Sequence, residues 1–250
     1  MRKSENGYTL IELVLVLVIV GVLASVGLTS LGTVNQTTRI EDTQQEMERL
    51  AWAIAGNPAL ASGGSRSDFG YVGDVGGLPP NLDALISSPG GYTTWDGPYL
   101  IDEFTSGGAD TQFRYDAWGS PYDYAGGTAI TSTGGGLTLT RQLASSTSNL
   151  LNNQVKVVVV DLDHTPPGQN YSDSLLIVLR VPNGSGSYVN RSRTPHDDGL
   201  AGFDSIPIGI HELRVVYSPT ADTLLRRIVV CPNSDGYVEI SMPENLWSGS

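Results

Sequence analysis

The chain has 250 residues, with 14 Lys and Arg against 26 Asp and Glu, and a formal net charge of −12. Hydrophobic residues make up 40% of it, which excludes a wholly disordered chain. The acidic balance, with no Lys/Arg cluster, excludes nucleic acid as a partner. The single cysteine, Cys231, excludes an intramolecular disulfide and is expected to be a small buried apolar residue.

The N-terminal segment from Leu10 to Leu31 is almost entirely apolar and holds one charged residue, Glu12. A helix needs about 20 apolar residues to cross a bilayer. Arg2 and Lys3 precede the segment and favour a cytoplasmic N-terminus. The pattern therefore predicts a single membrane pass, with the rest of the chain on the outer side.

Three kinds of segment fit this pattern: a secretory signal peptide cut near Ala24, a plain single-span anchor, or a prepilin leader followed by its helix. Glu12 separates them. A carboxylate in a membrane helix costs about 2.5–3.5 kcal/mol at the helix centre and less toward its ends. In a signal peptide or a plain anchor, a carboxylate with this unfavourable free energy would serve no purpose, so Glu12 indicates a functional role.

The run Gly7-Tyr8-Thr9-Leu10-Ile11-Glu12 follows a short basic leader. It resembles the cleavage and N-methylation motif of type IV pilins and type II secretion pseudopilins, with Tyr8 where Phe is usual. The resemblance implies that a prepilin peptidase cuts between Gly7 and Tyr8 and that the new Tyr8 amine is methylated. It further implies that Glu12 of one subunit neutralises the Tyr8 amine of a neighbour, since a buried unpaired charge is strongly unfavourable.

The helix is predicted to continue into water and to end near Ala55, because Pro58 disfavours helical geometry in the residue before it. Ile40, Met47, Leu50 and Ile54 recur at helical spacing, which predicts one buried face. We therefore expect a leader over 1–7 and a single helix over 8–55, of which 8–31 forms the membrane segment or filament core. Trp52 is also expected in the core.

The region 56–144 is rich in glycine pairs, and Asn81 is a candidate cap of a short helix. The later run Asp116-Ala117-Trp118-Gly119-Ser120-Pro121-Tyr122 resembles an element of the major pseudopilin of type II secretion. The resemblance implies a pilin globular domain over 56–144. Turn-forming residues and aromatic residues that pack on the helix are then expected in the run: Asp116, Trp118, Gly119, Pro121 and Tyr122.

Two features depart from that family. Ala117 stands where Pro is usual, and the segment 125–134, where the family has an acidic calcium-binding loop, contains no carboxylate. Calcium takes six to eight oxygen ligands, several of them from Asp or Glu. We therefore expect no calcium site and no other cofactor.

The C-terminal part has a Ser- and Asn-rich segment at 145–154, expected to be a linker, and then a β-sandwich over 155–250. Five strands are predicted: 155–161, 174–181, 206–217, 224–231 and 237–242. The segment Pro207–Tyr217 of the third strand is similar to a strand of transthyretin-like and carboxypeptidase-regulatory-like domains. The fold class expected for the whole chain is α+β: a long helix on a small antiparallel sheet, followed by an all-β sandwich.

No motif of an enzyme is present, so the chain is not expected to be one. The acid–histidine runs 161–164 and 196–198 are interpreted as solvated loops, with a metal site as the less favoured alternative, and His211 as a surface residue.

The resemblance to pilins implies a structural subunit of a helical filament, foremost a type II secretion pseudopilin that supports protein export. A type IV pilus subunit, or a filament-borne adhesin whose sandwich binds a surface ligand, is the alternative. Its partners would be like subunits, the prepilin peptidase and an inner-membrane assembly platform. Its location would be the bacterial inner membrane, with the N-terminus in the cytoplasm, and then a periplasmic or extracellular filament.

Overall fold

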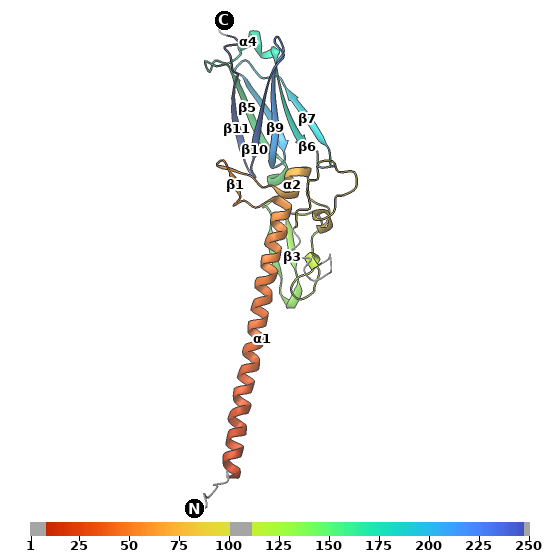
Figure 1. Ribbon diagram of the computed structural model, residues 1–250, viewed down its shortest axis with the longest axis vertical. Helices are drawn as coiled ribbons and strands as arrows, with labels where there is room; N and C mark the ends of the chain where they lie inside the picture. Colours follow the sequence, from red (N-terminus) through yellow and green to blue (C-terminus); the bar gives the residue numbers. More distant parts are fainter. Residues whose placement is uncertain (1–8, 101–111, 248–250) are drawn as a thin grey trace, which may run out of the picture.

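The computed structural model describes residues 9–100 and 112–247, and in residues 24–33 the backbone only. The expected leader 1–7, including Gly7, and the expected first mature residue Tyr8 lie outside the described residues. Figure 1 shows one long helix, α1, projecting from a head that contains all the other elements.

Helix α1 spans Leu10–Ala55, 46 residues, which makes it about 69 Å long at 1.5 Å per residue. Its N-terminus is closed by a capping box between Thr9 and Glu12. It ends at Gly56, where φ is 80° and a Cβ would lie 2.3 Å from the carbonyl oxygen of Asp68. Only glycine fits this position. The observed end at Ala55 confirms the predicted end of the helix.

The first part of α1 has no contact with the head (Figure 1). Large apolar side chains between Leu10 and Leu23 are 48% to 82% exposed. Over the parts of the chain whose side chains are described, no helix meets the length and apolarity needed to cross a membrane. The expected membrane segment 8–31 extends beyond those parts, into residue 8 and the side chains of 24–31.

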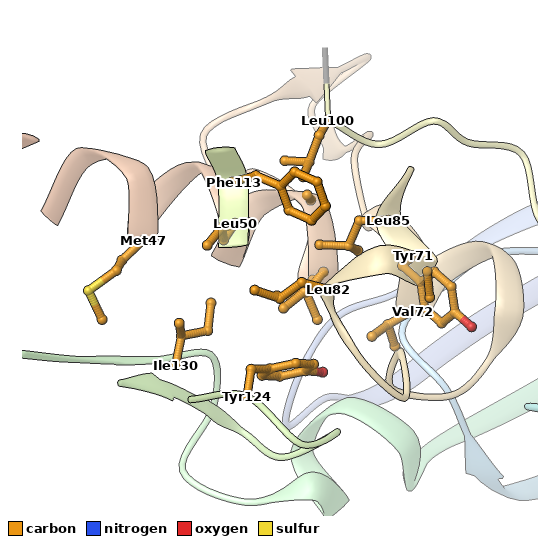
Figure 2. Close-up of a cluster of buried hydrophobic side chains, with 14 of the residues drawn as sticks. Met47, Leu50, Tyr71, Val72, Leu82, Leu85, Leu100, Phe113, Tyr124 and Ile130 are labelled. Carbon is orange, nitrogen blue, oxygen red and sulfur yellow. The ribbon is translucent and has the colours of Figure 1, made fainter. Parts of the chain in front are cut away.

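The last third of α1 packs on the head through the predicted face: Met47, Leu50 and Ile54 are buried, and Ile40 is half-buried. Figure 2 shows Met47 and Leu50 beside Phe113, Leu82 and Ile130 in one apolar cluster. Trp52 is 36% exposed, so its predicted place in the core is wrong. The physical reason is its position, two residues before Ile54, which turns it away from the buried face.

Short elements surround this cluster. They are β1 (Ala61–Ser62), β2 (Ser65–Arg66), α2 (Gly70–Val75), η1 (Leu82–Leu85), η3 (Gln112–Arg114), β3 (Ala129–Ser132), η4 (Gly134–Gly136), β4 (Leu139–Gln142) and α3 (Thr147–Leu151). Asn81 caps η1, as predicted, by accepting a hydrogen bond from the Ala84 N–H. Strands β3 and β4 form an antiparallel pair that packs against α1.

The C-terminal part is built from seven strands: β5 (Asn153–Val160), β6 (Leu175–Pro182), β7 (Tyr188–Arg193), β8 (Leu200–Ile206), β9 (Gly209–Tyr217), β10 (Asp222–Val230) and β11 (Asp235–Ser241). Short helices α4 (Gly168–Tyr171) and η5 (Ser172–Ser174) lie between β5 and β6. The strands form two sheets, β10-β9-β6-β7 and β11-β5-β8, in which β11 and β5 are parallel and the other pairs antiparallel.

Both sheets contribute alternate residues to one buried cluster, for example Val157 of β5, Ile177 of β6 and Val215 of β9. Each sheet therefore has one inner and one outer face, which makes this part a two-sheet sandwich. The five predicted strands correspond to β5, β6, β9, β10 and β11. Strands β7 and β8 were not predicted.

The two parts meet along a close junction. The segment expected as a linker contains α3, whose Leu150 is buried in the cluster around α1. Ile208, between β8 and β9, is buried in the same cluster. The Gly184 N–H donates 2.8 Å to the Val75 carbonyl oxygen. Apolar packing and backbone hydrogen bonds thus connect the sandwich to the helical part.

Candidate assembly site

The carboxylate of Glu12 lies at the N-terminal end of α1, where it accepts two hydrogen bonds from Thr9. The Thr9 N–H and the Thr9 hydroxyl each lie 2.9 Å from Glu12 Oε2, and the Glu12 N–H donates back to Thr9 Oγ1 at 3.3 Å. The geometry turns the carboxylate toward the start of its own helix. The helix begins at Leu10, two residues after the predicted cleavage point between Gly7 and Tyr8 in the sequence, and both Gly7 and Tyr8 lie outside the described residues.

A second group of predicted residues forms a tight turn beside α1. Asp116 is buried and accepts four hydrogen bonds: from the Trp118 and Ser120 N–H groups at 2.9 Å, from the Ser132 hydroxyl at 2.5 Å and from the Gly134 N–H at 3.1 Å. Gly119 adopts φ 81°, and its N–H donates to the Asp116 carbonyl oxygen at 2.8 Å. Tyr115 bridges to Pro121, which closes the turn.

This turn contacts α1 through polar groups. The Tyr122 hydroxyl donates 2.8 Å to Glu46 Oε2, and the Ala117 N–H donates 3.2 Å to Thr43 Oγ1. Burial raises the pKa of Glu46 above its usual value, with the hydrogen bond from Tyr122 acting in the opposite direction. Burial also raises the pKa of Tyr122. These hydrogen bonds fix the axial position of the turn relative to α1.

The calcium ligands that the family resemblance implies do not fit this chain. The segment 125–134 offers no carboxylate, and Asp116, next to it in space, already accepts four hydrogen bonds. The Gly134 N–H donates to Asp116 and so connects this segment to the turn. Within residues 9–100 and 112–247, no group of three or more His, Cys, Asp or Glu side chains is arranged to hold a metal ion.

The acid–histidine runs lie in exposed segments as expected, with the exception of Asp161. Asp161 is fully buried, and its Oδ1 accepts from the N–H groups of Asp163 and Thr165, so this residue is not in a solvated loop. His164 lies at the surface, 3.0 Å from Glu239. Asp197 and Asp198 are exposed.

His211 is also not at the surface as expected. It is 1% exposed, and its Nε2 lies 2.8 Å from the Pro207 carbonyl oxygen. Burial lowers the pKa of His211. His211 lies on the same face of β9 as the inward-facing Leu213 and Val215, two and four residues further along the strand. This spacing is the signal that would have placed it correctly.

Two comparisons of the sequence with known proteins give a match. Residues 2–28 match the family model of the prokaryotic N-terminal methylation motif. A stretch of 124 residues, 49% of this chain, is 28% identical to the type II secretion system core protein G of Xanthomonas campestris pv. campestris and covers 70% of that protein. The chain is thus similar to proteins of the type IV pilin and type II secretion pseudopilin family, in its N-terminal methylation motif and in the stretch shared with the core protein G.

Solved structures add no further argument. A dioxygenase domain from Streptomyces sp. SirexAA-E aligns at a TM-score of 0.31 with 10% identity, over 40% of this chain and 85% of that one. The Bacillus anthracis TIE protein aligns at 0.28 with 15% identity, over 48% of this chain and 24% of that one. Both scores are too low to support a statement about fold or activity.

Proposed function

We propose that the chain is a structural subunit of a helical pilin-like filament, most specifically a type II secretion pseudopilus that supports protein export. The observation that carries the proposal is the bare first part of α1, in which large apolar side chains between Leu10 and Leu23 are 48% to 82% exposed. A surface this apolar requires lipid before assembly and other helices after it. The similarity to a core protein G of type II secretion supports the secretion system over a pilus.

The position of Glu12 supports a role in assembly. Its carboxylate faces the start of the helix, and Glu12 follows the predicted new N-terminus at Tyr8 by four residues in the sequence. In a bundle of such helices, a carboxylate and an amine that are both removed from water stabilise each other only when paired. The pair between Glu12 of one subunit and the Tyr8 amine of its neighbour would set the axial position of each new subunit.

The proposal includes three partners and no catalytic role. A prepilin peptidase would cut between Gly7 and Tyr8, an inner-membrane assembly platform would move the subunit out of the bilayer, and like subunits would receive it. The N-terminus would lie in the cytoplasm and the head in the periplasm or outside the cell. The Asp116 turn would keep its structural role beside α1.

Processing is tested by the mass of the N-terminal peptide of the chain isolated from its native membrane. The proposal predicts a peptide that begins at Tyr8 and carries a methyl group on its amine. A peptide that begins near Ser25, or one that retains Met1 through Gly7, would contradict it. Expression without the peptidase is the control and should yield the uncut chain.

A further inference from the structure

The two outer faces of the sandwich carry opposite charge. On the β10-β9-β6-β7 sheet, the outward residues include three arginines and one glutamate, a net charge of +2; we call this the basic face, defined by Arg180, Arg214, Arg227 and Glu212. On the β11-β5-β8 sheet, they include three acids and one lysine, a net charge of −2; this is the acidic face, defined by Asp204, Asp235, Glu239 and Lys156.

The register of the strands groups the charges of the basic face. Arg227 of β10 lies opposite Glu212 of β9, which lies opposite Arg180 of β6. Arg214, on the same strand as Glu212, is 3.3 Å from that carboxylate. Arg180 lies over the ring of Tyr188 at 4.1 Å. One glutamate cannot balance three guanidinium groups, so the face keeps an excess positive charge in a chain that is acidic as a whole.

Each face also exposes apolar side chains next to its charges. On the basic face, Leu225 is 53% and Ile210 46% exposed; on the acidic face, Tyr237 is 63% exposed. Tyr237 lies between Asp235 and Glu239 along β11 and opposite Lys156 of β5. An apolar centre with charged residues around it is the composition of a protein–protein contact.

The two faces cannot meet within one chain, because they point away from each other on either side of sheets that pack about 10 Å apart. Two copies can bring them together. Figure 1 shows the strands of both sheets running roughly along the direction of α1, so both faces point sideways from the long axis. Subunits whose helices pack side by side would therefore present these faces to their lateral neighbours.

We propose that the basic face of one subunit docks on the acidic face of a second copy of this chain. The contact is heterologous, because the patch on one copy differs from the patch on the other. This type of interface builds open helical assemblies. The inference rests on the proposed filament function and adds to it a lateral contact between heads, outside the contact between the apolar helices.

Charge reversal in the full-length chain tests the contact. Arg180→Glu with Arg227→Glu turns the basic face negative, so both faces then repel. Asp235→Arg with Glu239→Arg turns the acidic face positive, with the same result. We expect each pair to reduce the amount of sedimentable filament about tenfold at low salt, as two or more like-charge contacts replace attractive ones. All four substitutions together restore complementarity and should restore the filaments.

The matched control is Asp173→Arg with Glu244→Arg, which makes the same charge change as the acidic-face reversal at exposed positions outside both faces. It should leave the amount of filament unchanged. If each single-face reversal gives as much sedimentable filament as the unsubstituted chain, the docking proposal is overturned and the proposed function is not. Absence of filaments from the unsubstituted chain would instead overturn the proposed function, so the two failures are distinguishable.

Cross-linking provides a second measurement that does not depend on charge reversal. In a Cys231→Ser background, one chain carries Leu225→Cys and a second carries Tyr237→Cys. Co-assembled and oxidised, they should give a mixed disulfide dimer. The pair Asp173→Cys and Tyr237→Cys is the control and should give none. A Leu225–Tyr237 yield no higher than this control, in filaments that form normally, would overturn the proposal.

Discussion

The backbone N–H of Ile208 donates a hydrogen bond of 2.8 Å to the carbonyl oxygen of Leu150, at the point where the sandwich meets the helical part. Both side chains are buried in the cluster that packs around α1. A residue that the chain supplies from between two strands of the sandwich thus completes the core of the other part. This packing couples the stability of the two parts.

We expect Ile208→Ala to lower the free energy of unfolding of the detergent-solubilised chain by about 2–5 kcal/mol, because it leaves a cavity in a fully buried site. Ile210→Ala is the matched control: it removes the same atoms two residues on, from a side chain that is 46% exposed. Its effect should stay within about 1 kcal/mol. Urea denaturation measures both, and equal losses would contradict the described packing.

The Asp116 turn gives a second prediction. Asp116→Asn replaces one carboxylate oxygen by an NH2 group. Each oxygen accepts from two donors, so two of the four donors lose their acceptor in a buried site. A loss of about 2–3 kcal/mol is expected in the same denaturation experiment. Asp123→Asn, at an exposed position on the neighbouring strand segment, should be close to neutral. If Asp116→Asn is also neutral, the hydrogen-bond network does not hold the turn.

Asp74 predicts a dependence of stability on pH. Burial, with smaller contributions from Asp96 and Asp68, raises its pKa from 3.8 to about 6, and the hydrogen bond from Tyr99 acts in the opposite direction. The folded chain therefore holds this proton more tightly than the unfolded chain between pH 4 and 6. Stability contributed by protonated Asp74 is present below that window and lost as the pH rises through it.

Asp74→Asn removes the carboxylate charge and with it the loss of stability at higher pH. It keeps an oxygen that accepts from the Tyr99 hydroxyl. It should stabilise the chain by about 1–2 kcal/mol at pH 8 and have almost no effect at pH 3.5. Unfolding midpoints at the two pH values measure the difference. Asp173→Asn, at an exposed position, is the control. A stabilisation that is equal at both pH values would contradict burial of the Asp74 charge.

Patterns in the sequence predicted the elements whose residues repeat most regularly. The apolar positions Met47, Leu50 and Ile54 placed the buried face of α1. Strand-like runs separated by turn residues placed β5, β6 and β9, and alternation around Leu213 supported β9. Strand β7 gave no such signal, because as an edge strand it is exposed at nearly every position. Gly202 interrupts the alternation in β8 and hid that strand.

The misplaced residues have a common cause. Trp52 and His211 were assigned by residue type, as a large aromatic and a polar side chain, whereas their phase in the helix and in the strand puts Trp52 outside and His211 inside. The opposite charge of the two sandwich faces depends on which strands pair in each sheet. Strand order is set by contacts distant in sequence, which no local pattern encodes.

The role of Glu12 in assembly is tested most directly by counting filaments made by Glu12→Gln, with Glu41→Gln, at an exposed position farther along the same helix, as the control. Glutamine keeps the size of the side chain and removes the charge that pairs with the neighbouring Tyr8 amine. We predict that the Glu12 variant is inserted and cut at Tyr8 like the control but forms no filaments. Filaments in normal number from the Glu12 variant would contradict the account.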